Sequence, residues 1–140
     1  MILFANKKPS KMPLIVYGSN VSAGFPSPAD DHTEGKLDLN EYLIKKPAAT
    51  FFARVEGESM KNSGIFNGDL LIVDRSLYPQ EKDIVIAVIQ GEMTLKRLKK
   101  INESWLLSAE NSLFPDIPID ENGCEIWGVV IHSIRKHYNR

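Results

Sequence analysis

Ser59 is the first residue whose surroundings could support chemistry. It lies in the segment Gly57-Glu58-Ser59-Met60-Lys61, between the apolar runs ATFFARV and GDLLIVD. The stretch MKNSG that follows is long enough for one helical turn closed by Gly64, and the oxygen of Ser59 would then cap the amides of that turn. The segment alone favours this capping role. A nucleophilic serine would also require a general base elsewhere in the chain.

Lys96 could supply that base. It lies in the run MTLKRL, where strand alternation puts Thr94, Lys96 and Leu98 on one face. A lysine in a basic run such as KRLK usually belongs to a solvated strand edge, and that alternative stays open. If the face of Leu98 is covered, however, Lys96 is a partly buried amine whose pKa falls below its ordinary value of about 10.4. The neutral amine could then take the proton of Ser59, while backbone amides at the start of the MKNSG turn hold the oxyanion.

Other signatures of catalysis and metal binding are absent from the sequence. The chain has no G-x-S-x-G, H-E-x-x-H or P-loop motif, and the one S-x-x-K, at residues 133–136, lacks its companion motifs. Its single cysteine, Cys124, excludes an internal disulfide and a cysteine-rich metal site. We therefore expect no cofactor and no metal, and a cytoplasmic location.

The composition is that of one ordinary soluble domain. The chain has 140 residues, of which 43% are hydrophobic and 25% charged, with a formal charge of -1. That balance gives no reason to expect binding to nucleic acid or to a membrane surface. The charge is uneven, since residues 1–23 contain three lysines and no acidic residue. No apolar run approaches the roughly 18 to 20 residues needed to span a bilayer.

From residue 50 onward the pattern predicts a mainly β domain. Short runs rich in β-branched and aromatic residues alternate with Gly, Asn, Asp and Pro. Gln90-Gly91 marks a tight hairpin between two of these runs. The predicted strands are 50–55, 70–74, 84–89, 93–98, 105–109 and 126–134.

Residues 1–37 are expected to form a flexible arm and linker, because their prolines and glycines disfavour sustained helix or sheet pairing. A short helix of about two turns should follow. Asp38 would cap it, Glu41 would reach back in a capping-box arrangement, and Pro47 would end it. We therefore divide the chain into an arm, 1–37, and a domain, 38–140.

The stretches GFPSPADD, DLNEYLIKKPAATFFARVEGESM, GIFNGDLLIVDRS, DIVIAVIQGEMTLKRL and EIWGVVIHSI together resemble the UmuD proteins of SOS mutagenesis. UmuD proteins are LexA-like self-cleaving serine peptidases, which are distantly similar to bacterial signal peptidases. The resemblance implies a β-clip domain of short twisted strands, with one short helix and an extended N-terminal arm. It also implies that Ser59 is the nucleophile and Lys96 its base. The family's self-cleaved bond, between a small residue and glycine, falls on Ala23-Gly24.

The resemblance implies a function as well. A RecA filament on single-stranded DNA would stimulate removal of the arm after DNA damage, and the cleaved homodimer would serve as accessory subunit of a Y-family translesion polymerase. LexA-type repressors carry a helix-turn-helix domain before the bond, which residues 1–23 cannot build, so we expect no sequence-specific DNA binding. Two alternatives stay open: a dimeric polymerase-binding module that does not cleave itself, and a signal-peptidase-like enzyme acting in trans, which would need a membrane anchor.

Overall fold

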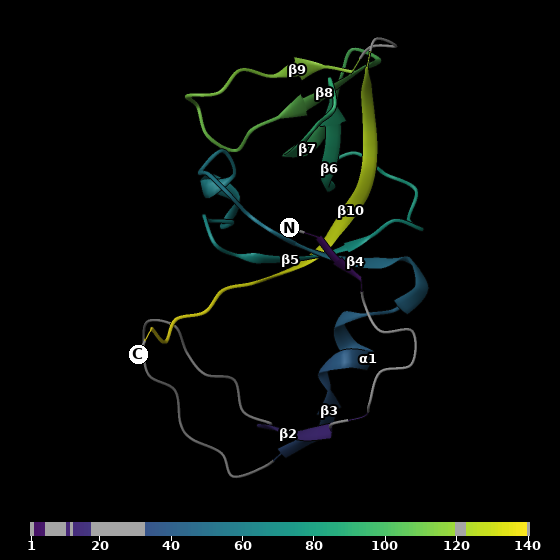
Figure 1. Cartoon of the computed structure of the whole chain (residues 1–140), viewed down its shortest axis with the longest axis vertical. Helices are drawn as coiled ribbons and strands as arrows, with labels where there is room; N and C mark the ends of the chain where they lie inside the picture. Colours follow the sequence, from purple (N-terminus) through teal and green to yellow (C-terminus); the bar gives the residue numbers. More distant parts are fainter. Residues whose placement is uncertain (1, 5–10, 12, 18–32, 120–122, 140) are drawn as a thin grey trace. The chain divides into compact units, whose positions relative to one another are not determined.

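The computed structural model describes residues 2–4, 11, 13–17, 33–119 and 123–139 (Figure 1). The chain forms two compact units, one of Met1–Asn6 with Lys46–Arg140 and the other of Lys7–Lys45. The predicted division at residue 37, between an arm that contains the expected cleavage bond and a domain of residues 38–140, stays a prediction.

The larger unit is built on an eight-stranded antiparallel sheet with the order β1-β4-β5-β10-β6-β7-β8-β9 among the described residues. The predicted mainly β class is confirmed, and each of the six predicted strands is present, with ends that differ by at most three residues. The strands are β1 Ile2–Phe4, β4 Thr50–Arg54, β5 Leu70–Asp74, β6 Ile84–Ile89, β7 Glu92–Ile101, β8 Ser104–Ser108, β9 Ile117–Pro118 and β10 Cys124–Ile134, with the 3-10 turns η1 Pro47–Ala49 and η2 Lys61–Ser63.

β10 joins the two halves of this sheet (Figure 1). Its first half pairs with β6 as far as Val129, and its second half pairs with β5 from Val129 onward. The register shifts between Ile126 and Gly128 and again between Val130 and His132. Such irregularities bend and twist a strand, which lets one strand serve both halves.

Two hydrophobic clusters form the core of the larger unit. The first consists of Ala53, Met60, Ile65, Leu71, Val73 and Ile86, and the second of Val85, Ala87, Leu98, Leu107 and Val129. Alternation along β7 sends Leu95 to the first cluster and Leu98 to the second. This strand is therefore covered on both faces, which decides the environment of the lysine between those two leucines.

Gly128 occupies a position in β10 that has no room for a side chain. A Cβ atom there would lie 2.6 Å from Cγ1 of Val73, which is fully buried, and 3.3 Å from Cγ of Arg75. We expect Gly128→Ala to lower the free energy of unfolding by about 1–3 kcal/mol, because the methyl group must displace a packed valine. Urea denaturation of the two proteins measures this difference, and an alanine variant as stable as the wild type would contradict the packing described here.

The predicted hairpin at Gln90-Gly91 is confirmed. Both residues have positive φ angles, 50° and 82°, and Ile89 pairs with Glu92 across the turn. Two successive left-handed residues are typical of the tight turns that match the twist of paired strands. The hairpin fixes the register of β7 against β6, in which Lys96 lies opposite Val85.

The prediction that the first 37 residues cannot pair was wrong. β1 pairs with β4, and in the smaller unit β2 (Pro13–Tyr17) pairs with β3 (Thr33–Asp38). Pro13 stands at the first position of its strand, where a missing N–H is tolerated. Pro13 thus begins a strand, and the prolines of this segment do not prevent pairing.

The predicted cap of the short helix is confirmed, but the helix is shorter than expected. α1 runs from Leu39 to Leu43, and the carboxylate of Asp38 accepts a hydrogen bond from the amide of Asn40 at 3.0 Å. Pro47 does not end α1; it begins η1. One helical turn with five residues has little stability of its own, so the chain returns to extended backbone at Ile44.

Candidate active site

Ser59 lies half-buried in the turn between β4 and η2, where it lines a cavity of about 280 Å³. Side chains from β4, β5, β6 and β7 form the other walls, and β7 contributes Thr94 and Leu95. Met60, 2% exposed, anchors the turn in the first hydrophobic cluster. Gly64 closes η2 with a φ angle of 79°, a left-handed conformation that glycine adopts without strain.

The capping role considered for Ser59 is wrong. No side chain caps η2, and the amides that the serine would cap have other acceptors. The N–H of Lys61 donates to the carbonyl oxygen of Glu58 at 3.2 Å, and the N–H of Asn62 donates to the carbonyl oxygen of Glu110 at 2.8 Å. The serine hydroxyl is therefore not engaged in holding the turn.

Two backbone donors at this turn remain available. Within the described part of the chain, the amides of Ser59 and Met60 donate to no acceptor, and the hydroxyl of Ser59 makes no hydrogen bond. Neighbouring N–H groups beside a nucleophilic oxygen are the usual components of an oxyanion hole. The turn can thus present a hydroxyl and two donors to a carbonyl group that enters the cavity.

Lys96 is buried, with only 6% of its surface exposed, and Leu98 on the same face of β7 is 2% exposed. The prediction of a buried amine is confirmed, and the solvated-edge alternative is wrong for this residue. Burial lowers the pKa of Lys96, and the carboxylate of Asp116 partly offsets that effect. The ammonium nitrogen lies 5.6 Å from the centre of the Phe114 ring, and no carboxylate of the described residues forms an ion pair with it.

The two predicted catalytic residues lie on elements that meet at the cavity. Ser59 shares its walls with Thr94 and Leu95, the residues directly before Lys96 in β7. Their pairing as nucleophile and base stays a prediction. The predicted cleavage bond, Ala23-Gly24, lies outside the described residues.

Sequence reasoning missed the residues around Lys96 that come from the connection after β8. Phe114 and Asp116 lie in that connection, and both are exposed; the ring of Phe114 lies beside the amine of Lys96, and the charge of Asp116 acts on its pKa. Their segment, SLFPD, has no periodicity that would assign it to either hydrophobic cluster. Only the folded chain brings it over β7.

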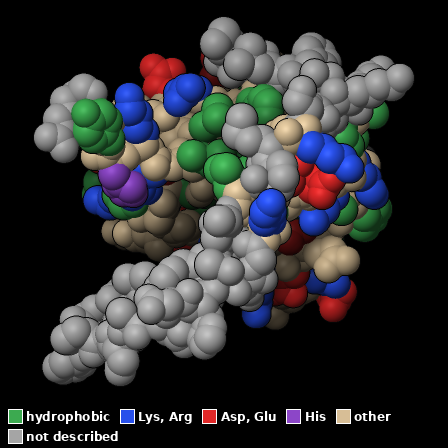
Figure 2. Space-filling view, turned by 90° about the horizontal axis from the view of Figure 1, so that it is seen from below, with side chains coloured by type: hydrophobic (Ala, Val, Ile, Leu, Met, Phe, Trp, Pro, Cys, Tyr) green, Lys and Arg blue, Asp and Glu red, His purple; other side chains and the backbone are tan. Residues whose placement is uncertain are grey.

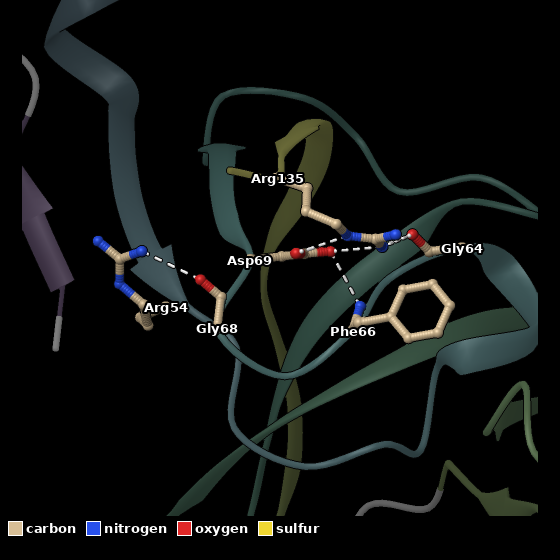
Figure 3. A network of polar contacts seen from close by, with 6 residues as sticks. All are labelled: Arg54, Gly64, Phe66, Gly68, Asp69 and Arg135. Carbon is tan, nitrogen blue, oxygen red and sulfur yellow. Dashed lines mark hydrogen bonds and ion pairs between the residues drawn. The ribbon is translucent and has the colours of Figure 1, made fainter. Parts of the chain in front are cut away.

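Asp69 and Arg135 hold the loop that follows the Ser59 turn (Figure 3). Asp69, 3% exposed, accepts hydrogen bonds from the amide of Phe66 at 2.9 Å and from Nε and Nη2 of Arg135, each at 3.0 Å. Arg135 also donates to the carbonyl oxygen of Gly64 at 2.6 Å, and its guanidinium lies 3.9 Å from the centre of the Phe66 ring. The end of β10 is thereby joined to the last residue of the serine turn.

This contact predicts an acid-sensitive contribution to stability. The hydrogen bond from Arg135 holds the pKa of Asp69 below its ordinary value. The unfolded chain therefore binds a proton at a higher pH than the folded one, and the contribution is present above the unfolded pKa of about 3.9 and is lost as the pH falls through the folded value. We expect Asp69→Asn to be about 1–3 kcal/mol less stable than wild type at pH 7.

That difference should shrink when the pH is lowered from 7 to 3, as measured by urea denaturation at each pH. A difference that stays constant over this range would show that the charge of Asp69 contributes nothing to stability.

Charges of both signs are interspersed around exposed hydrophobic side chains on the face shown in Figure 2, with no continuous basic surface. The described residues contain no group of three His, Cys, Asp or Glu side chains arranged to hold a metal ion. Of the helices in the described ranges, none has the length and apolar character to cross a membrane. On the residues described, the features that could carry chemistry are those around Ser59 and Lys96.

Comparison with known proteins relates the chain to a peptidase family. A family model described as "Peptidase S24-like" matches residues 13–131. Protein ImpA of Salmonella typhimurium is 50% identical over 126 residues, which cover 86% of this chain and 83% of that protein. Protein MucA of Escherichia coli is 43% identical over 129 residues, covering 86% and 84%. The LexA repressor of Actinobacillus succinogenes is 36% identical over 136 residues, covering 95% of this chain and 63% of the repressor.

Proposed function

The chain belongs to the peptidase S24-like family, and from this premise we propose that it is a serine peptidase that cuts its own chain at Ala23-Gly24. Ser59 is the nucleophile in this proposal and Lys96 is its general base. The N–H groups of Ser59 and Met60 hold the oxyanion. The processed protein is the active form.

One observation supports the proposal: Lys96 is buried and its pKa is lowered by that burial, and the two residues before it in β7, Thr94 and Leu95, line the cavity of the unengaged Ser59. A lysine can act as a general base only in its neutral form, which exposure to water would make scarce at neutral pH. Desolvation supplies that form without a histidine or an acid. A lysine that serves only solubility would be expected to keep its amine in water, where its pKa is not lowered by burial.

The proposed reaction has two steps. In the first, Oγ of Ser59 attacks the carbonyl carbon of Ala23 while Nζ of Lys96 takes the hydroxyl proton. The tetrahedral oxyanion collapses, the bond to the nitrogen of Gly24 breaks, and the ammonium of Lys96 gives its proton to the leaving amine. In the second step a water molecule, deprotonated by Lys96, hydrolyses the ester on Ser59 and releases the arm.

Self-cleavage suits a slow site of this kind. A bond in the same chain reaches the site at an effective concentration far above that of a separate substrate, so a modest rate is sufficient for one turnover. Alanine before the bond is small enough for a shallow pocket. The resemblance to UmuD proteins extends the proposal to the partners: a RecA filament on single-stranded DNA stimulates cleavage, and the cleaved homodimer joins a Y-family polymerase.

Intact-mass spectrometry tests the proposed function. The purified chain is incubated alone at pH 7 to 10, and separately with RecA filament on single-stranded DNA at pH 7.4. We expect loss of residues 1–23 and a product that begins at Gly24. An unchanged mass under every condition would contradict self-cleavage and favour a binding module that retains the fold.

A further inference from the structure

Arg97 links the strand of Lys96 to the turn of Ser59. Its Nε donates to Oε1 of Glu110 at 2.6 Å, and its Nη2 donates to Oγ of Ser63 at 2.7 Å. Its Nη1 donates to the carbonyl oxygen of Lys82 at 2.6 Å. Each of the three nitrogens of the guanidinium is thus bonded to a different segment, and the rigid fork of arginine fixes the angles between these bonds.

Two more hydrogen bonds reach the serine turn from the residues that follow β8. The carbonyl oxygen of Glu110 accepts the N–H of Asn62 at 2.8 Å. The side-chain amide of Asn111, 5% exposed, donates to the carbonyl oxygen of Glu58 at 3.1 Å. Glu110 therefore binds the turn with its backbone and Arg97 with its side chain.

These contacts enclose Ser59 on both sides. Residue 58 is held before the serine, and residues 62 and 63 are held after it, while Ser59 itself has no hydrogen bond among the described residues. The ion pair between Arg97 and Glu110 is about a quarter exposed on each side chain, so solvent screens it only in part. No direct bond joins Ser59 to Lys96 in the described chain, so other groups must set their separation.

We propose that Arg97, Glu110 and Asn111 form a brace that positions the Ser59 turn relative to the strand of Lys96. They are positioning residues: none contacts the scissile bond in this scheme, and each acts through the turn. Proton transfer requires the two heavy atoms to approach within hydrogen-bond distance, and a displacement of about 1 Å can reduce a rate by about a hundredfold. This inference rests on the proposed self-cleavage.

Positioning predicts a specific pH signature. Arg97 and Lys96 are neighbours in a strand, so their side chains leave opposite faces of β7. The pKa of Lys96 responds to its burial and to the carboxylate of Asp116, and its amine lies beside Phe114. The guanidinium of Arg97 is instead bonded to Glu110, Ser63 and Lys82. Removing the guanidinium should slow cleavage equally at every pH. The midpoint of the pH–rate profile, which reports the burial of Lys96, should not move.

The experiment measures self-cleavage rates of the full-length chain from pH 7 to 10 for wild type, Arg97→Gln, Arg97→Lys and Ser63→Ala. Arg75→Gln is the matched control, because that arginine also donates a backbone hydrogen bond and stacks on a ring, both on Trp127 and neither at the serine turn. We expect Arg97→Gln to be 10- to 100-fold slower with an unchanged midpoint. Arg97→Lys should recover part of the wild-type rate, and Ser63→Ala should cleave a few-fold more slowly than the wild type. Arg75→Gln should cleave at the wild-type rate.

Amide hydrogen exchange at Asn62 gives an independent reading, since its N–H is held by Glu110. Exchange there should accelerate at least tenfold in Arg97→Gln while exchange in β6 stays unchanged. Wild-type cleavage rates in Arg97→Gln, or a midpoint that moves with the rate, would overturn the brace and leave the proposed function standing. A wild-type chain that never cleaves would instead overturn the proposed function, and the catalytic purpose of the brace with it.

Discussion

Ser59→Ala should leave the 140-residue chain intact under every condition that cleaves the wild type. The hydroxyl of Ser59 is the protein group that bonds to the substrate carbon in the proposed reaction, so its removal eliminates the acyl intermediate. Lys96→Ala should slow cleavage by about 10²- to 10⁴-fold, the range that a positioned general base usually contributes. Intact mass against time measures both effects.

Matched variants separate loss of chemistry from loss of fold. Lys96→Met keeps an apolar stem of similar length in the buried site and removes only the amine, so it should fold and cleave as slowly as Lys96→Ala does. Lys99→Ala changes a lysine of the same strand that is only partly buried, and Ser104→Ala changes an exposed serine of β8; both should cleave as the wild type does. Cleavage of Lys96→Met at the wild-type rate would remove Lys96 from the mechanism.

Raising the pH should accelerate self-cleavage of the isolated chain. The pKa of Lys96 is lowered by burial, and the neutral amine is the reactive form. Below the folded pKa the neutral fraction grows about tenfold for each pH unit, and above it the fraction saturates. We therefore expect a rate that rises with a slope of one on logarithmic axes and then levels off, with a midpoint below the ordinary lysine value of about 10.4.

The plateau distinguishes this mechanism from attack by hydroxide ion. Hydroxide catalysis also rises tenfold per pH unit, but it continues to rise and does not require Lys96. Lys96→Met should therefore cleave at a low rate that keeps rising with pH and reaches no plateau. This variant is the control for the measurement. Equal rates between pH 7 and pH 10 in the wild type would contradict a lysine base.

Much of the strand pattern could be predicted because each strand carries its own signal. β5 and β6 are nearly continuous apolar runs with clear ends, and their bounds in the structure are those predicted. Gln90-Gly91 carries a local turn signal that does not depend on the rest of the fold. By contrast, β1 and β2 have no such boundaries, because the prolines near them indicate loops unless the pairing partner is known.

For the site, the alternation around Lys96 predicted a buried amine only on the condition that its face of β7 is covered, and the structure shows that this condition is met. The sequence could show that Lys96 and Leu98 share a face, but not that both are buried or that Phe114 lies beside the amine. The brace could not be predicted at all. Arg97 reads as one of several surface cations in KRLK, and its partner Glu110 is thirteen residues away in an irregular segment.

The pKa of Lys96 is the quantity that tests the central claim most directly. Titration of the full-length Ser59→Ala protein, with lysines labelled for NMR and the Lys96 signal assigned by its absence in Ser59→Ala/Lys96→Met, follows this one amine without interference from cleavage. We expect Lys96 to lose its proton at a lower pH than the other lysines of the chain, with a midpoint below 10.4. A midpoint for Lys96 equal to that of the exposed lysines would contradict a buried amine as the base that activates Ser59.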